Sequence, residues 1–84
     1  MSYIARVSVM PKAGISDPQG QTIERALPAL GFDGVSEVRM GKTITLSVDA
    51  SSRAAAREKV EAMCERLLAN TVIESYDIAL EGGP

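Results

Sequence analysis

The chain has 84 residues, 45% of them hydrophobic, and its 9 basic and 11 acidic side chains give a net charge of −2. This length suits one domain with a small core. The balanced charge argues against a nucleic-acid partner, because phosphate binding needs clustered Lys and Arg. The first residues show no signal-peptide pattern, and no apolar run approaches the roughly 20 residues of a membrane span. We therefore expect one cytoplasmic domain over residues 1–82, with residues 83–84 as a frayed tail.

The first two predicted elements are a strand and a helix. Residues 3–10 alternate in the manner of a strand, and one face carries Tyr3, Ala5, Val7 and Val9. The stretch ISDPQG predicts a helix start, in which the residues that follow Ser16 are Asp17, Pro18, Gln19 and Gly20. Asp17 is the expected cap, and Pro18 suits the first helical position. An apolar stripe continues to Leu30, where Gly31 is expected to stop the helix in the left-handed conformation.

The middle of the chain predicts a β-hairpin. Gly34 is a turn residue before an expected strand over residues 35–40, and Gly41 with Lys42 forms the expected hairpin turn. The next strand covers residues 43–48. Its alternation is regular, and the side chains expected to face the core are Ile44, Leu46 and Val48.

A second helix and a last strand complete the predicted elements. Ser51 or Ser52 caps a helix that runs to about Ala69, Asn70 is the cap residue at its end, and a strand follows over residues 73–80. The order β-α-β-β-α-β is the split-βαβ, ferredoxin-like arrangement. Right-handed crossovers then place both helices on the same face of the sheet. We therefore predict an α+β fold in which a four-stranded antiparallel sheet carries two helices on one face.

Few residues of this sequence could carry catalysis. Histidine is absent, which removes the usual general base and the usual metal ligand. The single cysteine, Cys64, lies beside the apolar stripe of the second helix and is expected to be a packed thiol. No Walker-type or dinucleotide-binding fingerprint occurs. We expect no catalytic residue, no metal site and no cofactor on this chain.

The predicted outer face of the sheet leaves two interpretations open. It combines small polar side chains with Ile4, Met10 and Ala79, and it lacks the Lys and Glu residues typical of a fully solvated sheet. A solvated antiparallel sheet is one interpretation. A sheet face or edge that meets another chain is the other, because edge strands present unpaired backbone groups.

Two stretches of the sequence resemble a known family. In the first, DPQG at residues 17–20 precedes ALPALGF at 26–32 and VSEVRMGK at 35–42. In the second, MCERLLAN at residues 63–70 precedes VIESY at 72–76. This ordered set spans nearly the whole chain and resembles PurS, the small subunit of bacterial and archaeal phosphoribosylformylglycinamidine synthase. Thr71 and Pro28 depart from the usual family pattern, which puts only the local geometry there in doubt.

The resemblance implies a structural role. PurS-like subunits are non-catalytic, associate with themselves through their sheets as dimers or tetramers, and bridge the glutaminase subunit PurQ and the synthetase subunit PurL. The complex is an ATP-dependent ligase that uses glutamine-derived ammonia to convert formylglycinamide ribonucleotide to the amidine in purine biosynthesis. ATP and magnesium belong to the synthetase subunit. The chain itself would hold its partners in register.

Four charged or polar residues are candidate contacts to such partners, namely Asp17, Gln19, Arg39 and Lys42. The alternative for each is an ordinary solvated side chain. A rival function for the whole chain is a free-standing ferredoxin-like dimer that binds a small metabolite as a sensor.

Overall fold

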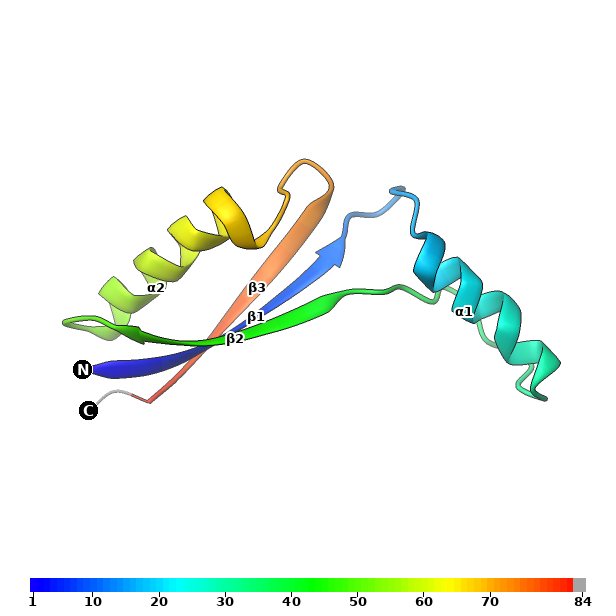
Figure 1. Cartoon of the computed structure of the whole chain (residues 1–84), viewed down its shortest axis with the longest axis horizontal. Helices are drawn as coiled ribbons and strands as arrows, with labels where there is room; N and C mark the ends of the chain where they lie inside the picture. The colour runs from blue at the N-terminus through cyan, green and yellow to red at the C-terminus, as the bar shows by residue number, and fades with distance from the viewer. Residues whose placement is uncertain (83–84) are drawn as a thin grey trace.

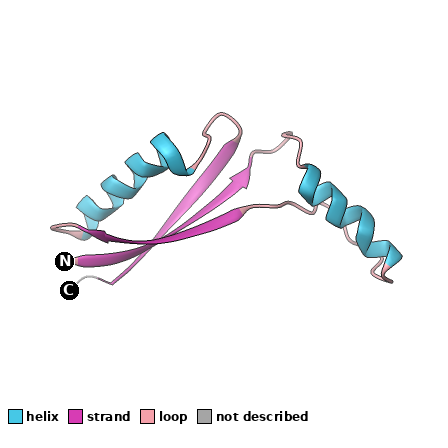
Figure 2. Ribbon diagram, in the orientation of Figure 1, coloured by secondary structure: helices cyan, strands magenta, loops and turns pink. Residues whose placement is uncertain are grey.

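A computed structural model of the chain describes residues 1–82. In chain order (Figures 1 and 2), its elements are β1 (Ser2–Pro11), α1 (Pro18–Ala29), β2 (Lys42–Asp49), α2 (Arg53–Met63), a π-helical turn η1 (Cys64–Leu68) and β3 (Glu74–Gly82). Both helices and the strands expected around residues 3–10, 43–48 and 73–80 are therefore confirmed, with ends shifted by one or two residues. For the second helix this holds when η1, which continues it to Leu68, is counted with α2. The predicted frayed tail lies outside the described residues.

The three strands form one antiparallel sheet in the order β2-β1-β3. Val7 at the middle of β1 lies opposite Ile44 of β2 and Ile78 of β3. The register is continuous on both sides, without a bulge. The central strand is therefore the one whose backbone is paired along both edges.

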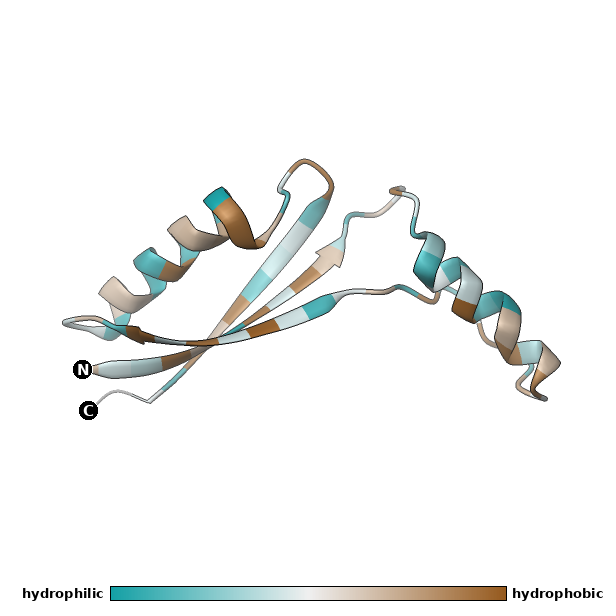
Figure 3. Cartoon of the chain, in the orientation of Figure 1, coloured by the Kyte–Doolittle hydropathy of each residue, from teal (hydrophilic) through white to brown (hydrophobic). Residues whose placement is uncertain are grey.

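The hydrophobic core lies between this sheet and α2. Hydrophobic and more polar residues alternate along the strands (Figure 3). Alternation along β1 buries every second side chain, and Ala5 and Val7 have no exposed surface at all. Helix α2 and the turn after it contribute Ala56, Val60 and Cys64, which are also fully buried. The core thus depends on α2 and the three strands and takes nothing from α1.

Helix α1 stands apart from the sheet, at one end of an elongated molecule (Figure 1). The extents are 51 × 26 × 14 Å, and the radius of gyration is 16.5 Å. A compact domain of this length has a radius of gyration of about 12 Å. Within α1 only Gly20 is buried. The apolar side chains Leu30 and Phe32, just beyond the helix, are 71% and 58% exposed.

Three details of the predicted fold differ from the structure of the single chain and are wrong for it. The sheet has three strands, not four, because residues 35–40 form no strand and pair with none in the described chain. Gly41 and Lys42 do not form a hairpin turn, since the chain passes through Gly41 directly into β2 (Figure 1). Only α2 covers the sheet, because the connections at residues 12–17 and at Gly41 carry α1 away from it.

Candidate functional site

Residues 18–41 form a projecting unit, which we call the arm. It consists of helix α1 and the chain that returns from α1 to β2, and carboxylate side chains hold these two parts together. Asp17 caps α1 by accepting a hydrogen bond from the Gly20 amide at 3.0 Å, and its second oxygen accepts one from the Met40 amide at 2.7 Å. Glu24 accepts a further hydrogen bond from the Val38 amide at 2.8 Å. Helix α1 and the extended segment 38–41 are therefore tied together by side chain to backbone contacts.

Gly20 is the point of closest approach between these two parts. A Cβ atom at this position would lie 2.5 Å from the Val38 carbonyl oxygen and 2.6 Å from the Asp17 carboxylate. Neither neighbour can withdraw easily, because one is backbone and the other is fixed by its two hydrogen bonds. Glycine is thus required here by close packing, whereas the sequence predicts Gly20 only as part of the helix start.

The Asp17 carboxylate is stabilised in its charged form. Hydrogen bonds from the Met40 and Gly20 amides hold its pKa below the ordinary value of 3.8, and the nearby Arg39 guanidinium lowers the pKa further. Partial desolvation acts in the opposite direction but does not outweigh these contacts. Asp17 is therefore an anion at neutral pH, and from its position just before the arm it binds the Gly20 and Met40 amides of the arm.

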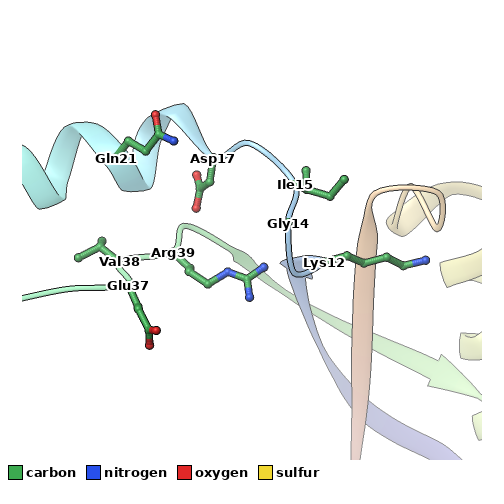
Figure 4. A pocket seen from close by; sticks show the side chains of 8 residues that line it. All are labelled: Lys12, Gly14, Ile15, Asp17, Gln21, Glu37, Val38 and Arg39. Carbon is green, nitrogen blue, oxygen red and sulfur yellow. The ribbon is translucent and has the colours of Figure 1, made fainter.

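A cavity of about 440 Å³ lies where the arm meets the body (Figure 4). The residues that line it are Lys12, Gly14, Ile15, Asp17, Gln21, Glu37, Val38 and Arg39. Arg39 extends toward the loop that contains Gly14, while Lys12 points away and donates to the Thr71 carbonyl at 2.7 Å. The lining carries two basic and two acidic side chains. This mixed charge suits polar contacts with a protein surface better than binding of a single highly charged ion.

The structure places the four predicted contact residues in three different settings. Asp17 and Arg39 come together at the cavity. Gln19, in the first turn of α1, lines a separate apolar groove of about 380 Å³ with Ile23 and Met40. Lys42 is exposed and begins β2 opposite Val9. Whether any of the four contacts a partner stays a prediction.

The predicted cap and turn residues occupy defined positions. Pro18 is the first residue of α1, and Gly31 and Gly34 have φ angles of 95° and 81°, which glycine adopts without strain. Gly41 passes so close to β1 that an added Cβ would lie 2.5 Å from the Val9 carbonyl oxygen. Asn70 organises the turn before β3 by accepting a hydrogen bond from the Val72 amide at 3.2 Å.

Sequence reasoning missed the roles of three charged residues. Glu24 ties the arm together, and Arg53 and Arg57 of α2 donate to backbone carbonyls of β3. The sequence offered a weak signal for Glu24, which lies within the apolar stripe of α1. It offered none for the arginines, because they lie on a helix face that is solvated in most small domains.

Two observations concern metal-ligating and thiol side chains among the described residues. No group of three or more metal-ligating side chains occurs among residues 1–82. The Cys64 thiol is buried, and this burial, with the nearby Glu65 and Glu61, raises its pKa and keeps it protonated at neutral pH. None of the helices in that part is both long and apolar enough to cross a bilayer.

Comparison with known proteins gives a consistent result. The family model described as PurS, phosphoribosylformylglycinamidine (FGAM) synthase, matches residues 4–82. A PurS subunit of phosphoribosylformylglycinamidine synthase from Synechocystis is 45% identical over an alignment of 84 positions, and the alignment covers 96% of this chain and 84% of the relative.

Solved structures agree. PurS of Methanocaldococcus jannaschii, a subunit of formylglycinamide ribonucleotide amidotransferase in the purine biosynthetic pathway, superposes with a TM-score of 0.84 at 41% identity, covering 98% of this chain and 99% of that one. A chain in the PurLQS structure from Thermotoga maritima superposes with a TM-score of 0.88 at 34% identity, covering 96% and 99% of the two chains. The chain therefore belongs to the PurS family of phosphoribosylformylglycinamidine synthase subunits.

Proposed function

We propose that this chain is a non-catalytic structural subunit of a phosphoribosylformylglycinamidine synthase complex. In that role it bridges a glutaminase subunit of the PurQ type and an ATP-dependent synthetase subunit of the PurL type. ATP and magnesium act on the synthetase subunit, and ammonia released from glutamine reaches that subunit while the bridging chain keeps the two sites in register. Membership of the PurS family and a relative within a PurLQS structure support this proposal.

The observation that carries the proposal is the arm. A free-standing small domain gains its stability by packing apolar side chains against its own core. Here Leu30, Phe32 and Met40 are 71%, 58% and 43% exposed on a unit held by polar contacts. Such an exposed apolar surface on a projecting unit is typical of a chain that completes its packing in an assembly.

Self-association is part of the same proposal. The sheet has one helix on one face and none on the other, and its outer strands present backbone groups that no strand of the described chain pairs. Open edges of this kind favour strand addition between chains. A dimer or tetramer of this chain would use these sheets.

Reconstitution tests the bridging role. Amidine formation is measured with matching PurL-type and PurQ-type subunits, with and without this chain, using either glutamine or ammonia as the nitrogen source. We expect glutamine-dependent turnover to require the chain and ammonia-dependent turnover to proceed without it. Equal turnover with and without the chain from glutamine would contradict the proposal. Saturable binding of a metabolite by the isolated oligomer would then favour the sensor function.

A further inference from the structure

The free edge of β3 has the properties of an edge that pairs with a further strand. β3 has 9 residues, whereas strands in globular proteins usually have about five or six. It pairs with β1 along one side, and no strand of the described chain lies along the other. Its apolar side chains Tyr76, Ile78 and Leu80 alternate with polar or small ones. A long, regular edge of this kind favours strand addition unless other groups cover it.

The backbone groups on this edge belong to the even-numbered residues of β3. In an antiparallel sheet, successive residues direct their N–H and C=O groups to opposite sides of the strand. The Lys12 amide donates to the Ile73 carbonyl at 2.9 Å, in register with the ladder between β1 and β3. The odd-numbered residues therefore bond to β1, and Ile78 and Leu80 direct their amides and carbonyls to the free edge.

Two arginines of α2 occupy this edge. The Arg57 guanidinium donates to the Ile78 carbonyl at 3.2 Å, and the Arg53 guanidinium donates to the Leu80 carbonyl at 2.6 Å. Residues four apart on a helix are separated by about 6 Å along its axis, and alternate residues of a strand by about 6.8 Å. One turn of α2 therefore matches one two-residue step of β3, and both outward carbonyls are bonded at the same time.

These contacts compete directly with strand addition. A further strand would lie about 4.8 Å from β3 and would need the same two carbonyls as acceptors. Its neutral amides would have to displace two charged donors, which form the stronger hydrogen bonds. An incoming strand therefore does not recover what the arginine contacts provide.

The pair of donors is a local feature of α2. One turn beyond Arg57, position 61 is a glutamate, whose carboxylate has no proton to donate at neutral pH. On β2, the other outer strand, α2 makes a comparable contact at the last residue, where Lys59 donates to the Asp49 carbonyl at 2.6 Å. The arginines therefore treat β3 differently from β2.

We propose that Arg53 and Arg57 close the β3 edge to strand addition by any extended chain, including a second copy of this one. The inference narrows the self-association proposed above, because it removes one of the two sheet edges, and it does not depend on the bridging role. A sheet that adds strands at both edges can grow into open-ended assemblies, whereas a sheet with one blocked edge cannot.

Replacing both arginines tests this block. Arg53→Met with Arg57→Met keeps unbranched apolar stems but removes the donors. Lys59→Met with Arg66→Met is the control, since it removes the same charge from α2 and η1 and breaks a similar contact away from β3. In sedimentation at equal concentration, we expect the arginine variant to reach about twice the mass of the wild-type assembly, because two freed edges can pair. The control should keep the wild-type mass.

A conservative pair completes the comparison. Arg53→Lys with Arg57→Lys keeps charged donors at both positions, so wild-type mass is expected. Wild-type mass for the methionine pair at these positions would overturn the inference. Equal growth of the control would also overturn it, because the effect would then follow from the lost charge and not from the freed edge.

Hydrogen exchange separates strand addition from loss of folding. In the methionine pair, an added strand would bond the outward amides of Ile78 and Leu80 and slow their exchange by about tenfold or more, while the Ala79 amide, which faces β1, would keep its protection. Faster exchange at all three amides would show that the arginines only fasten α2 to the sheet, and would overturn the inference. Because these measurements use this chain alone, their failure is distinct from failure of the reconstitution assay.

Discussion

The body of the molecule and its arm are stabilised in different ways. In the body, β1 and α2 bury apolar side chains such as Val7 and Val60, and these belong to one buried cluster with residues from all three strands and the helix. In the arm, no apolar side chain is fully buried, and the carboxylates of Asp17 and Glu24 hold the backbone in place. The chain therefore completes one small core by itself and leaves the apolar residues of its arm exposed, where other chains can contact them.

The largest expected effect is a core truncation in the body. Val7→Ala removes two methyl groups from a side chain with no exposed surface. Transfer and cavity terms together predict a loss of roughly 2 to 3 kcal/mol in the free energy of unfolding. Chemical denaturation measures it, with Ser8→Ala on the exposed face of the same strand as control. Equal losses for the two variants would contradict the assignment of the core to this face.

A substitution at the closest approach within the arm should affect the arm more than the body. Gly20→Ala places a Cβ 2.5 Å from the Val38 carbonyl oxygen, so α1 and segment 38–41 must separate. Hydrogen exchange of the Val38 and Met40 amides is expected to accelerate about tenfold, while amides of β1 keep their protection. Gln19→Ala, at the exposed preceding position, is the control. Unchanged exchange at both arm amides would show that the two parts of the arm are not tied there.

The pH dependence of the arm should follow Asp17. The pKa of Asp17 in the folded chain lies below the ordinary value of 3.8, so its contribution to stability is fully present above that value and is lost as pH falls through the lowered pKa. An NMR titration of the Met40 amide should show this transition in the wild type. In Asp17→Asn the side chain can still cap α1, but the Met40 contact is lost and the transition should disappear. A Met40 titration that persists in this variant would assign it to another group.

The smallest effect is expected at Glu37. Its φ angle of 57° is costly for a residue with a Cβ atom. Glu37→Gly relieves this strain but adds freedom to the unfolded chain, so the free energy of unfolding should rise by about 0.5 kcal/mol or less. Thermal unfolding compares it with Glu37→Ala, which keeps the strain. A clear loss of stability in the glycine variant would mean that the Glu37 side chain makes a contact of its own.

Local features of the fold could be predicted from sequence, and distant pairings could not. Helix starts at Asp17 and Ser52 follow from capping chemistry, which acts within a few residues. The segment 35–40 has the composition of a strand, but its partner depends on whether the chain reverses at Gly41. Both outcomes satisfy the same alternation, so the sequence could not distinguish a closed hairpin from a straight run.

The candidate site shows the same division. The position of Asp17 before Pro18 is a local signal that predicts a cap, and the structure adds the second contact of Asp17, to the Met40 amide across the arm. Glu24 and the α2 arginines act on backbone groups far away in the chain, at Val38, Ile78 and Leu80. Contacts of that range depend on the completed fold, which a pattern of neighbouring residues does not contain.

The detached arm also has a consequence for surface area. A compact monomer of 8.9 kDa is expected to expose about 4,800 Å². This chain exposes 5750 Å², which leaves an excess of roughly 900 Å². One partner's share of a standard protein interface is about 800 Å². By leaving its arm unpacked, the chain therefore carries about as much surplus surface as one specific interface removes from water.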